Sequence, residues 1–246
     1  MPRKNRITEP GYYHVISRGV EKRNVYLENE DYSMFLDILV EVFKKYMVTL
    51  HVYTLMTNHY HLLLETHEYN ISDVMRRVNS LYSIYFNKKY KRVGHLWQGR
   101  FKSYYLYDDT HFWIVAKYIE RNPTKAKMVK SLCEYKYQSF YQWKNKKEYY
   151  TFLKKSKIFE MTLNEYESFI SSEMQSDISE IVYASPKLVK KNGKMKLLKR
   201  RLETFFEFDR DINRNQNIKD AYEYGYTKAD IANFIGLSHT GVAKIV

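Results

Sequence analysis

Two histidines separated by one residue are the feature of this 246-residue sequence that points most directly to chemistry. They lie in the run Asn58-His59-Tyr60-His61-Leu62-Leu63, within a stretch rich in β-branched, aromatic and leucine residues that predicts a strand. Because side chains alternate across a strand, His59 and His61 project from the same face and can hold one divalent metal ion. Strands also carry polar residues at this spacing on solvated faces, so a structural role is the alternative.

Two histidine ligands leave coordination positions open. This arrangement suits a catalytic Mg²⁺ or Mn²⁺ that must bind a phosphate oxygen, rather than a closed structural zinc site. Such an ion would act as a Lewis acid on a scissile phosphate. Asn122 is a candidate third ligand, and helix capping is its alternative role.

The same chemistry needs a nucleophile, and Tyr118 in the run Tyr118-Ile-Glu-Arg-Asn-Pro123 is a candidate. A tyrosine can attack a phosphodiester and leave a covalent phosphotyrosine, which keeps the bond energy for a later rejoining step. Asn122 lies four residues after Tyr118 and would share its helix face. The chain has 25 tyrosines, so composition alone does not favour Tyr118 over Tyr104, Tyr105 or Tyr85.

The charge balance indicates a polyanionic partner. Lys and Arg number 41 against 28 Asp and Glu, which gives a formal charge of +13, and 17% of the residues are aromatic. Residues 76–102 carry eight basic residues and no acidic one, interleaved with aromatic rings, as a site for single-stranded or hairpin DNA would. Candidate DNA contacts there are Arg77, Arg100 and Lys102, although an amphipathic helix with a solvated basic face would look the same.

The elements that must position these residues can be read from hydrophobic periodicity and from breaker residues. Alternating strand-like and helix-like segments between Gly11 and Asn122 predict one α+β domain. The expected elements are a strand at 12–17, a helix at 31–46, two strands within 48–65 that break at 57–58, a helix from 70 to about 90, a strand or hairpin within 94–107, and a helix from 111 to about 121 that Pro123 ends or kinks.

After residue 140 the composition changes. Lysine-rich runs at 144–157 and 187–201 predict a basic helical connector over 141–205 between a first domain, 1–140, and a C-terminal module, 206–246. In that module a helix at 227–235, a turn at Gly236-Leu237-Ser238 and a second helix have helix-turn-helix spacing, with a plain αα-hairpin as the alternative. Duplex DNA is the partner expected for it.

Four motifs in order resemble the single-tyrosine HUH transposases, the IS200-like transposases, and in particular their REP-associated tyrosine transposase branch. They are YHVISRG at 13–19, NHYHLLL at 58–64, GHLWQGRFKS at 94–103 and YIERNPTKAKMV at 118–129. The resemblance covers residues 8–140. It implies a ferredoxin-like or RRM-like antiparallel sheet with helices on one face and the histidine pair on a central strand, followed here by the all-α helix-turn-helix region.

The resemblance also implies an activity. It assigns Tyr118 as the nucleophile of a metal-dependent DNA transposase that cleaves and rejoins single-stranded DNA near hairpins, through a 5′-phosphotyrosine with a free 3′-OH. Some relatives share active sites between subunits, so a homodimer is one oligomeric state to expect. The alternatives are a non-catalytic, sequence-specific DNA-binding regulator derived from a transposase, and a nuclease that uses activated water.

Other classes are excluded by what the sequence lacks. No apolar run approaches the roughly 18 residues of a spanning helix, so no membrane partner is expected. The N-terminus has no secretion signal, which predicts a cytoplasmic protein associated with the nucleoid. The six histidines other than His59 and His61 are assigned to packing or surface positions.

Overall fold

The computed structural model describes residues 6–173, 178–191, 194–206 and 213–246. The chain forms two compact units. One spans Thr8–Ala184, and the other spans Ser185–Val246 together with the N-terminal residues up to Ile7. The division lies between Ala184 and Ser185, whereas the sequence predicts boundaries at 140 and 205, each of which falls inside a unit.

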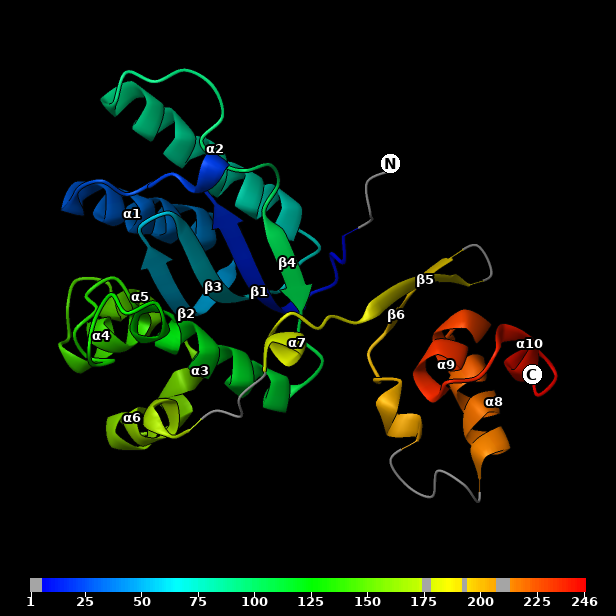
Figure 1. Cartoon of the computed structure of the whole chain (residues 1–246). Coiled ribbons are helices and arrows are strands. Elements are labelled where there is room, and N and C mark those ends of the chain that lie inside the picture. Colours follow the sequence, from blue (N-terminus) through cyan, green and yellow to red (C-terminus); the bar gives the residue numbers. More distant parts are fainter. Residues whose placement is uncertain (1–5, 174–177, 192–193, 207–212) are drawn as a thin grey trace. The chain divides into compact units, whose positions relative to one another are not determined.

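A four-stranded antiparallel sheet forms the centre of the first unit (Figure 1). Its strands are β1 (Gly11–Arg18), β2 (Val48–Met56), β3 (His59–Thr66) and β4 (Lys102–Tyr105), in the spatial order β2-β3-β1-β4. With α1 (Asn29–Lys45) between β1 and β2, and α2 (Ile71–Lys89) between β3 and β4, this is the expected ferredoxin-like arrangement. The predicted strand at 94–107 is shorter than expected, because only its last third pairs with β1.

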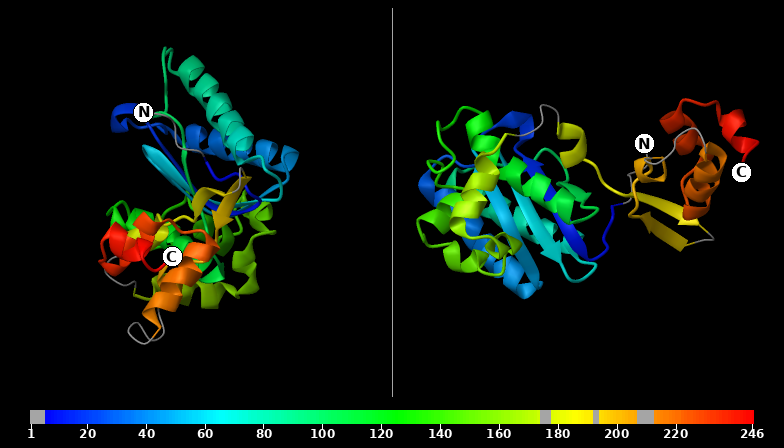
Figure 2. Two further views of the ribbon diagram at one scale, coloured as in Figure 1. Left: turned by 90° about the vertical axis from the view of Figure 1, so that its right-hand side faces the viewer. Right: turned by 90° about the horizontal axis from the view of Figure 1, so that it is seen from below.

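Helices cover both faces of the sheet, whereas the prediction placed them on one face (Figures 1 and 2). On one face, Tyr60 packs against Phe35 of α1 and donates a hydrogen bond to Asn79 of α2. On the other, Val52 and Leu63 pack against α3 (Asp109–Lys125). Strands β2 and β3 are buried on both faces along most of their length, so each face needs a helical cover.

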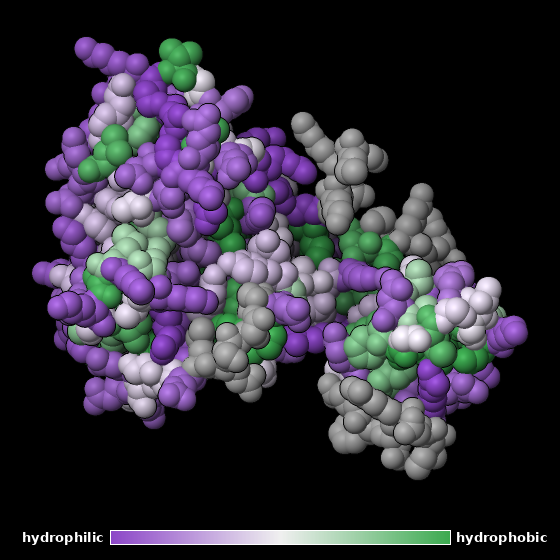
Figure 3. Space-filling view, viewed as in Figure 1, coloured by the Kyte–Doolittle hydropathy of each residue, from purple (hydrophilic) through white to green (hydrophobic). Residues whose placement is uncertain are grey.

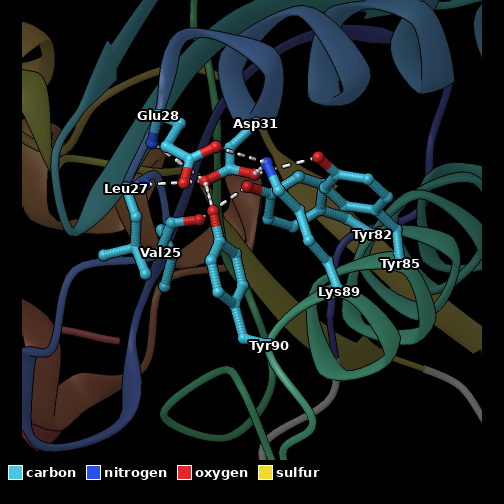
Figure 4. A network of polar contacts seen from close by, with 8 residues as sticks. All are labelled: Val25, Leu27, Glu28, Asp31, Tyr82, Tyr85, Lys89 and Tyr90. Atoms are coloured by element: carbon cyan, nitrogen blue, oxygen red, sulfur yellow. Dashed lines mark hydrogen bonds and ion pairs between the residues drawn. The ribbon is translucent and has the colours of Figure 1, made fainter.

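A buried carboxylate joins the start of α1 to the end of α2 (Figure 4). Asp31 accepts hydrogen bonds from Tyr85, Tyr90 and Lys89, and from the backbone at the start of its own helix. Burial alone would raise the pKa of Asp31, but the hydrogen bonds from Lys89 and Tyr90 bring it below the usual value. The network fixes the C-terminal half of α2, from which the segment leading to β4 continues.

Helix α3 continues through Pro123 to Lys125, so the predicted end near Arg121 is wrong. A proline at 123 cannot donate the backbone hydrogen bond that the carbonyl of Ile119 would otherwise accept. The hydroxyl of Thr54, on β2, donates to that carbonyl instead, at 2.9 Å. This substitute donor satisfies a carbonyl that the proline would otherwise leave without its helical partner.

The segment predicted as a basic helical connector belongs largely to the core of the first unit. It forms α4 (Ser139–Lys144), α5 (Tyr150–Leu153), α6 (Leu163–Ser171) and α7 (Ser179–Val182). Its apolar side chains, among them Trp143, Ile158 and Tyr166, complete the cluster around α3. Further along, the predicted helical character is absent from two described segments, since β5 (Lys187–Lys191) and β6 (Lys194–Leu198) pair as antiparallel strands.

The second unit combines the hairpin β5–β6 with α8 (Arg214–Tyr224), α9 (Lys228–Ile235) and α10 (His239–Ala243), and the described elements within 206–246 are all helices, as predicted. Gly236 ends α9 with φ +70°, in the left-handed region that glycine tolerates, and Ser238 caps α10. Ile231, Ala232 and Val242 are buried against Leu198 of the hairpin and its neighbours. Helices α9 and α10 and the turn between them lie where the sequence predicts them, whereas α8 was not predicted.

Hydrophilic side chains predominate on the face of the first unit seen in Figure 3, with hydrophobic ones scattered among them. Among the described residues, no helix combines the length and the apolar character that a membrane span requires.

Candidate active site

The face of the sheet that carries α3 collects the polar residues of four motifs. Strand register places His61 opposite Ile16, which in turn lies opposite Lys102. His59 lies opposite Arg18 at the end of the same strands. Since residues opposite each other share a face, the histidine pair, Arg18 and Lys102 lie on one surface.

The two histidines are held by hydrogen bonds through their Nδ1 atoms. His59 Nδ1 lies 2.6 Å from Asn58 Oδ1, and His61 Nδ1 lies 2.9 Å from Nε2 of the buried His14. Burial lowers the pKa of His59 to about 4, with the charge of Arg18 adding to the effect. Burial also lowers the pKa of His61 well below its usual range. Both rings are therefore neutral at pH 7, as metal ligands must be.

Tyr118 comes to this surface from α3. Its ring packs edge-on against His61, with centroids 5.9 Å apart. Its hydroxyl is hydrogen-bonded to the hydroxyl of Tyr183, which directly follows α7, at 2.6 Å. Asn122, one turn further along α3, donates its amide to the carbonyl of Tyr118.

These residues line one pocket with a volume of about 590 Å³. That volume is in the range of sites that hold small ligands, so it can admit a nucleotide. The described residues that line it include three cations and no carboxylate, which favours an anion. They are Ile16, Ser17, Arg18, His59, His61, Gln98, Arg100, Lys102, Tyr104, Tyr118, Asn122 and Tyr183.

Comparison with known proteins places part of the chain in a family. Residues 8–122 match the family model of IS200-like transposases. This part of the chain belongs to the IS200-like transposase family. No curated protein matches the sequence.

Two solved structures show the extent of the likeness. One is described as a REP-associated tyrosine transposase bound to a REP hairpin. It is 18% identical, with a TM-score of 0.51 over 58% of this chain and 84% of that chain, which shows the fold alone. The other is a candidate transposase from Deinococcus radiodurans R1, 20% identical, with a TM-score of 0.36 over 49% of this chain and 97% of that chain.

The loop before β4 brings Arg100 to the pocket of the transposase domain. Backbone hydrogen bonds from Val20 to Leu96 and from Gln98 to Arg18 tie this loop to the end of β1. Trp97 is buried against Tyr60 and Tyr82, and Gly99 takes a φ of +85° that favours glycine. The motif GHLWQGRFKS therefore anchors a turn that presents a cation.

Arg77 lies elsewhere, exposed on α2 and not among the pocket residues. The aromatic rings of 76–102 also differ from the expectation that they stack on bases. Tyr82, Phe86 and Trp97 are buried in the core, and the hydroxyls of Tyr85 and Tyr90 bind Asp31. Their main role is packing.

The donor set is compatible with a divalent cation. Both histidine rings, of His59 and His61, form their hydrogen bonds through Nδ1. In the part of the chain that the structure describes, their Nε2 atoms have no hydrogen-bond partner. Asn122 uses its amide nitrogen, which leaves its oxygen as a hard donor. No group of three His, Cys, Asp or Glu side chains suited to a metal occurs among the described residues. Two imidazoles and an amide oxygen leave positions open for phosphate and water.

Three functional candidates were missed by the sequence analysis. His14 was assigned to packing, Arg18 was not singled out, and Tyr183 lies in a segment without a clear pattern. The register of β1 against β3 would have indicated the first two, because it sets Arg18 opposite His59 and His14 diagonal to His61. No local signal marks Tyr183, which lies 65 residues beyond Tyr118.

Proposed function

We propose that the first unit cleaves and rejoins single-stranded DNA near hairpins through a covalent 5′-phosphotyrosine on Tyr118. The observation that carries the proposal is the shared pocket, in which a phenol, two neutral imidazoles and three cations come together. Membership of the IS200-like transposase family supports DNA as the substrate. All these groups belong to one chain.

In the proposed reaction, the Tyr118 hydroxyl oxygen forms a bond to phosphorus while the bond from phosphorus to O3′ breaks. The phenol proton is lost to solvent and O3′ takes up a proton, which leaves a free 3′-OH and a 5′-phosphate on the tyrosine. A second strand's 3′-OH reverses these bonds to rejoin DNA. Arg18, Arg100 and Lys102 would hold the flanking phosphates.

A divalent cation, Mn²⁺ or Mg²⁺, would be held by His59, His61 and Asn122 and would polarise the scissile phosphate when bound. Imidazole nitrogen is a better ligand for the softer ion, so Mn²⁺ is expected to support the reaction at lower concentration than Mg²⁺. The described residues that line the pocket include no carboxylate, which points in the same direction.

For the second unit we propose duplex DNA binding by a helix-turn-helix formed from α9 and α10. The support is the tight turn at Gly236 and the exposure of His239, Thr240 and Lys244 on and beside α10. These side chains could reach base edges or phosphates in a major groove. Lys187 and Lys196, which are exposed on the hairpin β5–β6, would add positive charge to the same module.

The deciding experiment incubates the protein with single-stranded hairpin oligonucleotides and Mn²⁺ or Mg²⁺, and resolves the products on a denaturing gel. We expect a covalent adduct that disappears in Tyr118→Phe. Tyr104→Phe is the matched control, since it removes a hydroxyl from the same pocket. An adduct formed by Tyr118→Phe would refute the assignment of Tyr118 as the nucleophile. Cleavage without an adduct would indicate activated water, and duplex binding with no cleavage would indicate a regulator.

A further inference from the structure

The buried imidazole of His14 has no part in the proposed reaction, yet it touches a proposed metal ligand. His14 is fully buried on β1, and its Nε2 lies 2.9 Å from Nδ1 of His61. In such a pair of neutral rings one nitrogen donates and the other accepts. Which one donates decides whether Nε2 of His61 keeps a lone pair.

A contact of His14 with the backbone favours one direction for this hydrogen bond. The other nitrogen of His14, Nδ1, lies 3.5 Å from the carbonyl oxygen of Val182, which can only accept. Nδ1 of His14 therefore carries the proton and its Nε2 accepts. The proton between the rings then belongs to Nδ1 of His61, so Nε2 of His61 is unprotonated.

The second histidine is fixed in the same way through an asparagine. The amide nitrogen of Asn58 donates to the carbonyl oxygen of Lys22 at 2.9 Å, which turns its Oδ1 toward His59. An amide oxygen accepts, so Nδ1 of His59 must donate. Each histidine is thus the start of a short hydrogen-bond chain, here called a relay, that ends at a main-chain carbonyl. Each relay leaves Nε2 of the ring free to bind a cation.

We propose that His14 and Asn58 are positioning residues that hold His61 and His59 as Nδ1–H tautomers, ready to bind one divalent cation through Nε2. The consequence for catalysis rests on the proposed function, but the tautomers themselves do not. Histidine ligands are commonly oriented by an acceptor at the ring nitrogen opposite the metal, and loss of such a partner weakens metal binding. A separate residue orients each ring, so each effect can be removed alone.

The two relays end at residues that lie far apart in the sequence of the first unit. Lys22 follows β1, whereas Val182 lies at the end of α7, beyond the residues that match the family model. Tyr183, the next residue, stacks on His14 with ring planes 15° apart and holds the Tyr118 hydroxyl. One short segment therefore supports both His61 and the nucleophile.

The test records long-range ¹H–¹⁵N spectra of metal-free, full-length protein with ¹⁵N-labelled histidine, in which the two tautomers have distinct patterns. We expect Nδ1–H for both His59 and His61. His14→Phe should shift His61 alone toward the Nε2–H form, and Asn58→Ala should shift His59 alone. His14→Gln and Asn58→Asp keep an oxygen acceptor and should retain the native tautomers.

Mn²⁺ titrations followed by electron paramagnetic resonance give the second readout. Affinity should fall about 10- to 100-fold in His14→Phe and Asn58→Ala. The exposed His95 supplies the control, because His95→Ala should leave both spectra and affinity unchanged. Wild-type spectra with Nε2–H on His61 or His59 would overturn the inference even if no variant folds. Native tautomers without Mn²⁺ binding would refute the metal proposal and leave the relays intact.

Discussion

Three tyrosines line the candidate active site, and their surroundings differ. Tyr118 and Tyr183 share a hydrogen bond, whereas Tyr104 contacts Tyr183 only through its ring. Burial and the hydrogen bond with Tyr118 raise the pKa of Tyr183. Tyr183 therefore stays a neutral phenol at pH 7 and can donate to the oxygen of Tyr118 as that oxygen gains negative charge.

Removal of this donor should slow the reaction without abolishing it. We expect Tyr183→Phe to reduce the rate of adduct formation about tenfold, the equivalent of one neutral hydrogen bond of about 1.4 kcal/mol. Rapid-quench assays on denaturing gels would measure the rate, with binding of the oligonucleotide measured separately. An unchanged rate would mean that the Tyr183 hydroxyl leaves Tyr118 before the reaction.

Residue types and spacing predicted which residues line the candidate site, but not the residues that orient them. The expected residues line one pocket: His59, His61, Tyr118 and Asn122. Residues two apart in a strand share a face of the sheet, and residues four apart in a helix share a face of the helix, so spacing alone grouped them. The roles of these residues stay predictions. His14 could not be found in this way, since its partner lies on another strand and only the pairing register brings the two together.

At the scale of elements, a proline inside α3 is compensated by a side chain from β2. The hydroxyl of the fully buried Thr54 donates a hydrogen bond to the carbonyl of Ile119, to which Pro123 cannot donate because it has no N–H. Sequence rules place a helix end before a proline, and they failed here because the compensating donor lies 69 residues before Pro123 in the chain. The continued helix keeps Asn122 on the same face as Tyr118.

A double-mutant cycle should expose this compensation. Thr54→Val leaves a buried carbonyl without a donor, so we expect it to lower the free energy of unfolding by about 1–3 kcal/mol. In a Pro123→Ala background the restored N–H can serve Ile119, and the same change should cost less than about 1 kcal/mol. Urea unfolding of the four proteins gives the coupling energy. Equal costs in both backgrounds would show that the threonine acts by packing alone.

Glu120 joins α3 to the start of α4. Its carboxylate accepts hydrogen bonds from the Ser139 hydroxyl, the Phe140 N–H and the Tyr166 hydroxyl. Burial raises the pKa of Glu120 to about 8. The native state therefore binds a proton that the unfolded chain releases near pH 4.5, so this group stabilises the fold at low pH and loses that effect as the pH rises toward 8.

The predicted pH dependence can be isolated with Glu120→Gln, which does not titrate. Between pH 6.5 and 8, where the buried His14 and His59 stay neutral in the native state, the wild-type free energy of unfolding should fall by up to about 2 kcal/mol relative to that of the variant. Urea unfolding at the two pH values measures the difference. Parallel changes in the two proteins would place the native pKa of Glu120 near its ordinary value.

The elements before residue 125 were largely predictable, and those after it were not. Strong apolar periodicity marks α1, α2 and the paired strands, so their order and the central histidine strand followed from the sequence. Between 141 and 205 lysines interrupt short apolar runs. Whether such runs form a connector or complete a core depends on tertiary contacts, such as those of Tyr166 and Ile170 with α3, that no local pattern reveals.

At the scale of the whole molecule, the surplus of 13 positive charges is divided between two separately folded units. In the first, Arg18, Arg100 and Lys102 surround the candidate active site. In the second, the lysines of 187–198 belong to the hairpin beside the proposed helix-turn-helix. If each unit binds DNA in its own way, a charge removed from one should impair one kind of binding only.

If the two units bind DNA independently, two substitutions should each impair a different activity. Thr240→Asp adds a negative charge to the exposed first turn of α10, where it suits the helix dipole and repels phosphates, so duplex affinity should fall at least tenfold while adduct formation is unchanged. Arg100→Ala should slow adduct formation, and reduce by about one the slope of log affinity against log salt for single-stranded DNA, without a change in duplex affinity. Fluorescence anisotropy over a salt series and denaturing gels supply both readouts. Lys44→Ala, an exposed cation on α1 away from the pocket, removes the same charge as Arg100→Ala and should change neither. If either substitution impairs both activities equally, the two units act as one DNA-binding surface.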